Sequence, residues 1–184
     1  MRIVGGLYRG RPLTAPASQA TRPTSDRLRE ALFNVLAHAY DEPASDARVL
    51  DLFAGTGALG LEALSRGASF ALFVDDAAEA RALIRQNIEA LGLTGSTRIF
   101  RRDASQMGAI GTDAPYSLVF CDPPYGKGLA HMALSAAKAG GWFKDNAIIV
   151  VEELAGAFML PPGFEELERR RYDASELTIL QPSP

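Results

Sequence analysis

The chain has 184 residues, of which 47% are hydrophobic and 22% are charged, and its formal net charge is −3 at pH 7. A chain of this length buries one sizeable core but hardly two, so we expect a single domain over residues 1–184. The lone cysteine excludes an internal disulfide framework, and no apolar run approaches the roughly 20 residues that span a bilayer. The start also lacks the apolar stretch of a secretory signal, so we expect a cytoplasmic protein that does not enter a membrane.

The charges are distributed unevenly along the chain. Residues 1–30 hold six arginines against Asp26 and Glu30, a local net charge of +4, which leaves −7 for the remainder. This basic start is a candidate phosphate-binding surface. The alternative is an ordinary solvated surface in a chain that prefers arginine to lysine. The six arginines are Arg2, Arg9, Arg11, Arg22, Arg27 and Arg29.

The first forty residues predict a hairpin followed by a helix. Two short strand-like pieces, residues 2–4 and 7–13, are joined through Gly5-Gly6, a pair typical of tight turns. Farther along, residues 28–39 carry apolar side chains at three- and four-residue spacing, after candidate helix caps at Thr24-Ser25.

From residue 48 onward, short apolar runs alternate with helical patterns, a rhythm typical of parallel sheets whose strands are connected by helices. We expect strands at residues 49–53, 70–75, 97–101, 116–121 and 147–151, and helices at residues 58–66, 77–91 and 129–139. Two final runs, residues 164–172 and 176–180, are separated by only three residues, so they should pair as an antiparallel hairpin. The pattern predicts an α/β core over residues 48–184, with residues 1–40 as an N-terminal appendage.

The turn after the first core strand is rich in glycine. Gly55, Gly57 and Gly60 have the spacing of a dinucleotide-binding loop, and Asp75 stands where such an enzyme keeps its ribose-binding acid. Asp51, just before the turn, argues against a nicotinamide cofactor. A carboxylate there repels a pyrophosphate but suits a cation, such as the ammonium of a methionine moiety. A tight turn with a surface aspartate is the structural alternative.

The second motif, Asp122-Pro123-Pro124-Tyr125, follows the strand expected at residues 116–121. Ligands bind at the carboxyl ends of the strands in an open parallel sheet. Two prolines fix a stiff bend that directs the carboxylate and nearby carbonyls into the crevice. Asp122 and a proline carbonyl can accept hydrogen bonds from an amino group while Tyr125 stacks on the ring that bears it, so the motif favours a planar base. A rigid loop without function is the alternative.

Together these motifs resemble a known group of enzymes. Residues 51–60, Asp75, Asp103 and residues 122–125 resemble class I S-adenosylmethionine-dependent methyltransferases that modify exocyclic amines. More narrowly, the chain resembles the RsmD family, bacterial 16S ribosomal RNA guanine-N2 methyltransferases. The segments that carry this narrower resemblance are RIVGG from Arg2, RGRPL from Arg9, RPTSDRLREALFN from Arg22 and LDLFAGTGALGLEALSRG from Leu50.

The resemblance implies a Rossmann-like fold, with a seven-stranded, mostly parallel sheet whose last strand runs antiparallel and with helices on both faces. It also implies S-adenosyl-L-methionine as the cofactor. The implied cofactor-binding residues are Asp51, Ala54, Gly55 and Gly57 for the methionine part, Asp75 for the ribose, and Asp103 with Ala104 for the adenine edge. The family usually has Glu where this chain has Asp75, and the adjacent Asp76 is a second candidate for the ribose.

By the same resemblance, the reaction is methylation of the exocyclic N2 amine of a guanine in 16S ribosomal RNA, guanine 966, in the small ribosomal subunit. The expected catalytic residues are Asp122, Pro123, Pro124 and Tyr125, and the expected RNA-binding residues are Arg9, Arg11, Arg22 and Arg27. We expect a monomer. We also expect no metal site, because the two histidines show no ligand spacing.

Two other functions stay open at the level of the residues. A DNA adenine-N6 or protein glutamine methyltransferase uses a similar loop, although a sequence-specific DNA enzyme needs an added recognition domain, for which 184 residues leave no room. The other is a non-catalytic RNA-binding assembly factor that keeps the fold. Residues 171–175 depart from a glycine-bearing pattern of the family, which leaves the geometry of the last hairpin open.

Overall fold

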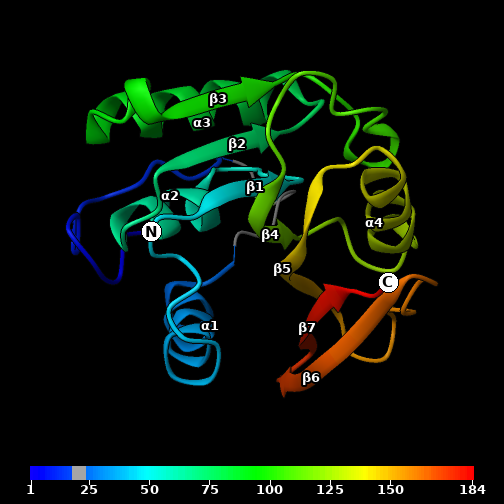
Figure 1. The fold of residues 1–184 in the computed structure, drawn as a ribbon. Coiled ribbons are helices and arrows are strands. Elements are labelled where there is room, and N and C mark those ends of the chain that lie inside the picture. The colour runs from blue at the N-terminus through cyan, green and yellow to red at the C-terminus, as the bar shows by residue number, and fades with distance from the viewer. Residues whose placement is uncertain (18–23) are drawn as a thin grey trace.

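The computed structural model describes residues 1–17 and 24–184, in which strands and helices alternate along the chain (Figure 1). The strands are β1 (Arg48–Leu52), β2 (Phe70–Val74), β3 (Thr97–Phe100), β4 (Tyr116–Cys121), β5 (Phe143–Leu154), β6 (Phe164–Tyr172) and β7 (Ser175–Pro182). The helices are α1 (Asp26–Ala39), α2 (Ala58–Ser65), α3 (Ala78–Leu91) and α4 (Leu129–Ala139), with short 3₁₀ turns η1 (Thr94–Ser96) and η2 (Ala104–Gln106). Strand β5 is longer at both ends than expected, because it pairs with β4 on one side and with β7 on the other.

The seven strands form one sheet in the order β3-β2-β1-β4-β5-β7-β6. Strands β1 to β5 pair in parallel, whereas β7 runs antiparallel to both of its neighbours, β5 and β6. The expected antiparallel hairpin and the single reversed strand are therefore confirmed. Strand order reverses between β1 and β4, and this switch point is where open α/β sheets bind ligands.

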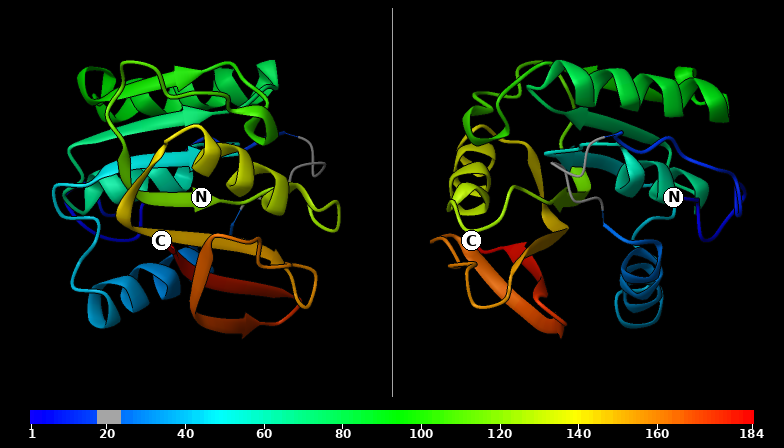
Figure 2. Two further views of the ribbon diagram at one scale, coloured as in Figure 1. Left: turned by 45° about the vertical axis from the view of Figure 1, so that its right-hand side comes forward. Right: turned by 180° about the vertical axis from the view of Figure 1, so that it is seen from behind.

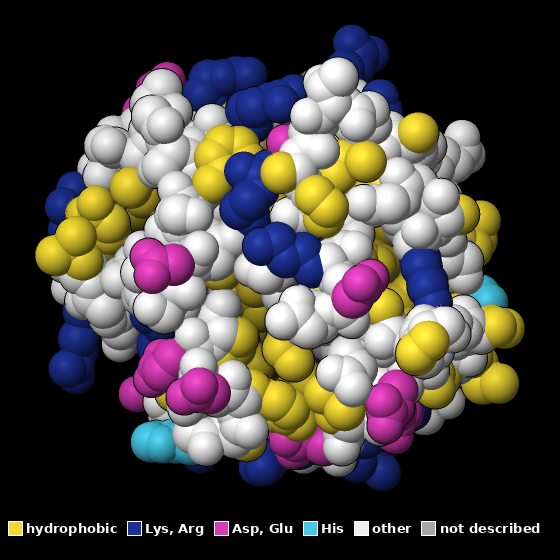
Figure 3. All heavy atoms as spheres, viewed as in Figure 1, with side chains coloured by type: hydrophobic (Ala, Val, Ile, Leu, Met, Phe, Trp, Pro, Cys, Tyr) yellow, Lys and Arg dark blue, Asp and Glu magenta, His cyan; other side chains and the backbone are white. Residues whose placement is uncertain are grey.

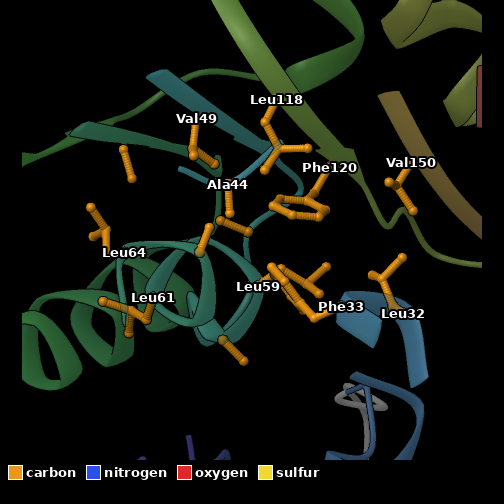
Figure 4. Close-up of a cluster of buried hydrophobic side chains, with 14 of the residues drawn as sticks. Leu32, Phe33, Ala44, Val49, Leu59, Leu61, Leu64, Leu118, Phe120 and Val150 are labelled. Atoms are coloured by element: carbon orange, nitrogen blue, oxygen red, sulfur yellow. The ribbon is translucent and has the colours of Figure 1, made fainter. Parts of the chain in front are cut away.

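Helices cover both faces of the sheet, as Figure 2 shows. One buried cluster joins apolar side chains of α1, α2 and α3 to one face, and a second cluster joins α4 and η2 to the other. In the first cluster, the rings of Phe33 on α1 and Phe120 on β4 lie 5.6 Å apart between centroids (Figure 4). Helix α1 thus packs against the same core as α2, and this packing fixes the position of its first turn beside the sheet.

The N-terminal hairpin differs from the expectation. Its two sides are joined by an isolated bridge between Arg2 and Pro12 and by a backbone hydrogen bond from Gly10 to Ile3, without regular strands at residues 2–4 and 7–13. The Gly5-Gly6 pair does not form a simple two-residue turn, because it lies against the end of α2. A Cβ on Gly6 would lie 2.0 Å from the carbonyl oxygen of Ser65, and that same carbonyl accepts a hydrogen bond from the backbone of Leu7. Contact with α2 replaces regular strand pairing here.

A buried carboxylate holds this N-terminal segment to the core. Glu62 on α2 is fully buried and accepts hydrogen bonds from the backbone N–H groups of Val4 and Gly5. It also forms ion pairs with Arg29 on α1, which is itself fully buried, and with Arg66. Helix α1 begins after Ser25, whose hydroxyl accepts from the backbone of Leu28 as the cap pattern predicts.

Candidate active site

Acidic side chains stand in a row where the parallel strands end. In the spatial order of the strands β3, β2, β1, β4 and β5, these residues are Asp103, Asp75, Asp51, Asp122 and Glu152. The carboxyl ends of parallel strands share one edge of a sheet, so the fold brings together residues that lie up to 101 positions apart in the chain. The row divides at the switch point into a part at β3, β2 and β1 and a part at β4 and β5.

The glycine turn lies between β1 and α2 and leaves space for a ligand. Gly55 and Gly57 have φ angles of +59° and +81°, a backbone region that favours glycine, and Gly57 is the N-cap of α2. A Cβ placed on Gly55 would meet nothing within 4 Å, so the backbone there is open to close approach. Gly60 has a different role. Its N–H donates to the carboxylate of Asp51 at 3.0 Å, and an added Cβ would lie 2.5 Å from the ring of Phe73.

Asp51 is enclosed more deeply than the sequence indicates. Its exposed fraction is 1%, and burial raises its pKa to about 8, helped by the charge of Asp75 and opposed by the hydrogen bond from Gly60. Near pH 7 the carboxyl of the ligand-free protein is therefore mostly protonated. The argument that Asp51 repels a pyrophosphate weakens accordingly, since it applies in full only to the ionised form.

The two remaining acids at this end of the edge are oriented by the backbone around them. Asp75 accepts hydrogen bonds from the N–H groups of Gly55 and Ala77, both at 3.0 Å, which places its carboxylate beside the glycine turn. Asp76 is exposed. Asp103 accepts from the backbone and the hydroxyl of Ser105 through one oxygen, at the start of η2, and Ala104 beside it is buried.

The second part of the edge is a connected hydrogen-bond network. The hydroxyl of Thr24, at the start of α1, lies 2.9 Å from the carboxylate of Asp122 and 2.9 Å from that of Glu152. The hydroxyl of Tyr125 donates to the other oxygen of Glu152 at 2.6 Å. Burial and the neighbouring Glu152 carboxylate raise the pKa of Asp122 well above its usual range. The bend after β4 buries Pro123 and leaves Pro124 exposed.

A cleft of about 640 Å³ opens beside this network. Its walls are the start of α1, the side chains of Tyr125 and Glu152, and residues 171–175 at the tip of the β6–β7 hairpin. Figure 1 shows α1 and this tip facing one another, and Figure 3 shows hydrophobic side chains in the surface between them. Arg27 and Arg171 bring positive charge to the cleft. Thr24 lines the cleft, and the carboxylate of Asp122 lies behind it, hydrogen-bonded to its hydroxyl.

The arginines of the basic start occupy different surroundings. Arg9 is exposed in the turn between the two sides of the N-terminal segment, whereas the guanidinium of Arg11 donates to the carbonyl of Ala90 in the last turn of α3. Arg27 is exposed on the first turn of α1, where it lines the cleft. Arg22 lies outside the described residues. The structure thus separates Arg9, at a loop tip, from Arg27, beside the candidate active site.

Three residues of this arrangement are missing from the sequence-based site: Thr24, Glu152 and Arg171. Glu152 directly follows the strand expected at residues 147–151, so the pattern of strand-end acids could have identified it. Thr24 was interpreted only as a candidate helix cap, and Ser25 is the residue that caps α1. Arg171 is near the site because β7 starts opposite the end of β5, which brings the hairpin tip to the carboxyl edge.

Among residues 1–17 and 24–184, no group of His, Cys, Asp or Glu side chains has an arrangement suited to a metal ion. Within the same residues, no helix combines the length and apolar character that a bilayer span requires. Cys121 is buried at the end of β4, and burial raises the pKa of its thiol well above the usual range, so a reactive thiolate is not favoured.

The strand order with its one reversed strand, the helices on both faces and the glycine turn after β1 define a Rossmann-like class I methyltransferase fold. A family model described as "Conserved hypothetical protein 95" matches residues 1–181. Ribosomal RNA small subunit methyltransferase D of Escherichia coli K12 is 44% identical over 154 residues, 83% of this chain and 74% of the relative. The chain therefore belongs to the RsmD family.

Further relatives agree with this assignment. The protein of the same name from Haemophilus influenzae is 34% identical over 83% of this chain and 78% of its own length. The solved structure of the Escherichia coli protein yhhF has a TM-score of 0.83 and 33% identity, and it covers 100% of this chain and 98% of its own. Because the similarity to yhhF covers the whole chain, it includes helix α1 and the final hairpin, two of the parts that wall the cleft.

Proposed function

We propose that this protein transfers a methyl group from S-adenosyl-L-methionine to the exocyclic N2 amine of a guanine in 16S ribosomal RNA, and that guanine 966 is the target by family resemblance. The observation that carries the proposal is the position of Asp122. The proline bend and the Thr24 hydroxyl hold this carboxyl at the end of β4, beside a cleft and across the switch point from the glycine turn. Relatives named ribosomal RNA small subunit methyltransferase D support an RNA substrate.

The residues at the ends of β1, β2 and β3 fit the proposed cofactor. The open backbone at Gly55 allows close approach, and the carboxyls of Asp75 and Asp103 retain acceptor capacity for ribose hydroxyls and an adenine amine. Asp51 supplies a negative charge when it ionises opposite a cationic group. Bound there, the cofactor would supply a methyl group already activated by the positive sulfur.

The protein's own contribution is then alignment and the removal of a proton. A guanine N2 amine is a weak nucleophile because its lone pair is delocalised into the ring. Hydrogen bonds from its protons to Asp122 and to a carbonyl of the proline bend favour a pyramidal nitrogen, whose lone pair is free to attack. Positioning of this kind accounts for a large part of the rate enhancement when the transferred group is already activated.

The cleft supports a nucleic-acid substrate in which the target base leaves its stack. Its volume of about 640 Å³ lies within the range of pockets that hold small ligands. Arg27 and Arg171 can contact phosphates on either side of an inserted nucleotide, and Tyr125 offers an aromatic side chain in the wall. Extruding a base costs a few kcal/mol from a duplex and less from a loop, so a looped RNA is the favoured substrate.

The direct test is nucleoside analysis after incubation with labelled cofactor. We expect N2-methylguanosine in RNA of small subunits from a strain that lacks the modification, and no label in naked DNA or protein fractions. Label in N6-methyladenosine of DNA, or in glutamine of protein, would replace the proposal with one of the other methyltransferase functions. Cofactor binding without transfer to any of the three substrates would favour a non-catalytic assembly factor.

Substitution of Asp122 tests which residue performs the chemistry. We expect Asp122→Ala to lower kcat by roughly 10²- to 10⁴-fold, the range typical of a positioned proton acceptor, with little effect on cofactor affinity. Asp122→Asn should retain more activity, because an amide oxygen still accepts a hydrogen bond from the amine. Single-turnover methyl transfer, cofactor affinity and thermal melting are measured for each variant. Wild-type transfer rates in a folded Asp122→Ala protein would move the chemistry to another residue.

A further inference from the structure

Glu152 is a buried acid that the proposed reaction does not yet use. It lies at the carboxyl end of β5, next to β4, with an exposed fraction of 6%. Both of its carboxyl oxygens are engaged by hydroxyl groups, Oε1 by Tyr125 at 2.6 Å and Oε2 by Thr24 at 2.9 Å. The same Thr24 oxygen lies 2.9 Å from Oδ2 of Asp122. One hydroxyl therefore bridges the two carboxyls.

This geometry determines how many protons the carboxyls of Asp122 and Glu152 hold. A threonine hydroxyl carries one hydrogen, so it can donate to Asp122 or to Glu152 but not to both. The other carboxyl oxygen also lies 2.9 Å from Thr24 Oγ1. A contact that short is a hydrogen bond only if this carboxyl is protonated and donates to a lone pair of Oγ1. Two ionised carboxylates on one hydroxyl would leave one contact repulsive. The Asp122–Thr24–Glu152 arrangement therefore holds one proton on its two carboxyls.

The surroundings also favour a single negative charge. The titratable and charged groups around the pair are Asp51 on β1, Cys121 on β4, Tyr125 in the proline bend, Glu153 on β5, Arg27 on α1, and Arg171, Tyr172 and Asp173 at the β6–β7 tip. The two arginines line the open cleft and have no ion pair with Asp122 or Glu152 among the described residues. Burial and the charge of Glu152 raise the pKa of Asp122, which agrees with a pair that shares one proton.

Either proton position satisfies the contacts of Thr24, so the substrate amine, which needs an acceptor, decides where the proton sits. With the proton on Glu152, the bonds run head to tail: Tyr125 donates to Oε1, Oε2 donates to Thr24, and Thr24 donates to Asp122. The second oxygen of Asp122 then accepts from the amine as an ionised carboxylate. With the proton on Asp122 instead, the carboxylate charge sits on Glu152, whose two oxygens already have Tyr125 and Thr24 as partners, and Asp122 has no ionised oxygen to offer the amine.

We propose that Glu152 is a positioning residue that retains the shared proton and, through the hydroxyl of Thr24, keeps Asp122 ionised and oriented toward the substrate amine. The proposal rests on the role of Asp122 in the proposed function. As the N–C bond forms and the C–S bond breaks, with its electron pair staying on sulfur, one amine proton passes to Asp122. The step needs Asp122 without a proton beforehand, and the bridge through Thr24 provides that state.

Replacing Glu152 by glutamine and by alanine separates this role from a structural one. Glutamine reproduces protonated Glu152, because its carbonyl accepts from Tyr125 and its NH₂ donates to Thr24. We expect Glu152→Gln to keep kcat within about 3-fold, whereas Glu152→Ala lowers it by about 10- to 100-fold, the equivalent of one hydrogen bond to a charged group. Glu153→Gln is the matched control, since Glu153 is as buried but contacts the backbone of Gly126 and Leu154.

The pH profile gives a readout that a purely structural role would not change. In the wild type, kcat should fall on the alkaline side as the Asp122–Glu152 pair loses its shared proton, and this limb should be absent in Glu152→Gln but present in Glu153→Gln. The acid limb, from protonation of Asp122, should remain in all three proteins. An alkaline limb that persists in Glu152→Gln, or a Glu152→Gln protein as slow as Glu152→Ala, would overturn the proposal.

Infrared spectroscopy of the RNA-free protein with carbon-13-labelled glutamate tests the proton count without any activity. A protonated carboxyl band that is present in the wild type near pH 7 and lost in Glu152→Gln places the shared proton on glutamate. A protonated Asp51 gives a band that is insensitive to the label and unchanged in Glu152→Gln. If the wild type shows this band and no other, the shared proton is refuted while the proposed function stays intact. Failure of the wild type to methylate guanine N2 would instead refute the proposed function.

Discussion

At the scale of single residues, Asp51 shows how burial changes the meaning of a charge. The sequence indicates an anion beneath a glycine turn, yet the structure encloses this carboxyl almost completely and raises its pKa to about 8. A cation bound at the glycine turn would favour the ionised form again. At pH 7, Asp51 is thus expected to be negatively charged mainly when a cationic ligand is bound.

A prediction for stability follows from this pKa. The folded state keeps the Asp51 proton up to about pH 8, whereas the unfolded state releases it near pH 4, so the free energy of unfolding should decrease as pH rises through that window. Asp51→Asn carries no such proton. We therefore expect the melting temperature of the wild type, relative to that of Asp51→Asn, to fall between pH 5 and pH 9, where thermal melts in matched buffers measure the difference.

The same variant should weaken cofactor binding. If a cationic group binds opposite Asp51, the wild type releases protons on binding at pH 7, and its affinity rises toward pH 8. Calorimetry in buffers with different ionisation enthalpies counts these protons. Asp51→Asn should bind more weakly and release fewer. Equal proton release in both proteins would show that Asp51 does not respond to the ligand's charge.

At the scale of elements, the N-terminal segment is fastened by polar contacts more than by strand pairing. Glu62 on α2 binds the backbone of Val4 and Gly5 and pairs with the buried Arg29 of α1. Because Thr24 lies just before α1, this one carboxylate links the basic segment to the geometry of the candidate active site.

We predict that Glu62→Ala destabilises the protein by about 3–5 kcal/mol, since it removes one of the two carboxylate partners of buried Arg29 and the acceptor of two backbone N–H groups. Denaturant unfolding measures this loss, and faster amide hydrogen exchange at Val4 and Gly5 should accompany it. The control is Glu79→Ala, which removes an exposed glutamate from the first turn of α3. Equal stabilities of the two variants would contradict an anchoring role for Glu62.

At the scale of the whole molecule, a net charge of −3 accompanies a positive N-terminal segment and two arginines in the cleft. Arg9 and Arg11 do not contribute in the same way, because Arg11 also binds the end of α3. Charge reversal at Arg11 would therefore disturb a helix end along with any RNA contact, whereas Arg9 is exposed at a loop tip. A substitution of Arg9 therefore tests the basic surface without also disturbing the end of α3.

We expect Arg9→Glu to weaken RNA binding and to lower the slope of log affinity against log salt by about 0.7 to 0.9, the effect of one lost phosphate contact. Cofactor affinity should not change. Lys144→Glu is the control, since Lys144 is an exposed lysine near the start of β5, outside the basic N-terminal segment. Salt titrations of RNA binding compare the two variants, and equal slopes would mean that the basic start is ordinary surface.

The local patterns of the chain were sufficient for the order and type of the core elements. Strand β4, helix α4 and strand β6 have the bounds expected from the sequence. The short link expected at residues 173–175 predicted the reversed β7, which begins at Ser175 in the structure. These features depend on side-chain periodicity and on how far a short connection can reach, which are properties of contiguous residues. The motif at residues 51–60 and the motif at residues 122–125 were recognised for the same reason.

Only the tertiary structure decided which residues surround Asp122. Thr24 lies just before α1, Glu152 lies on β5 and Arg171 lies at the β6–β7 tip. They meet because the strand order puts β5 beside β4 and because α1 packs against the sheet. It also decided that Asp51 holds a proton near neutral pH and that Gly5-Gly6 lies against α2 without forming a regular hairpin. Burial, pKa and hydrogen-bond partners depend on residues distant in the chain, so local periodicity does not contain them.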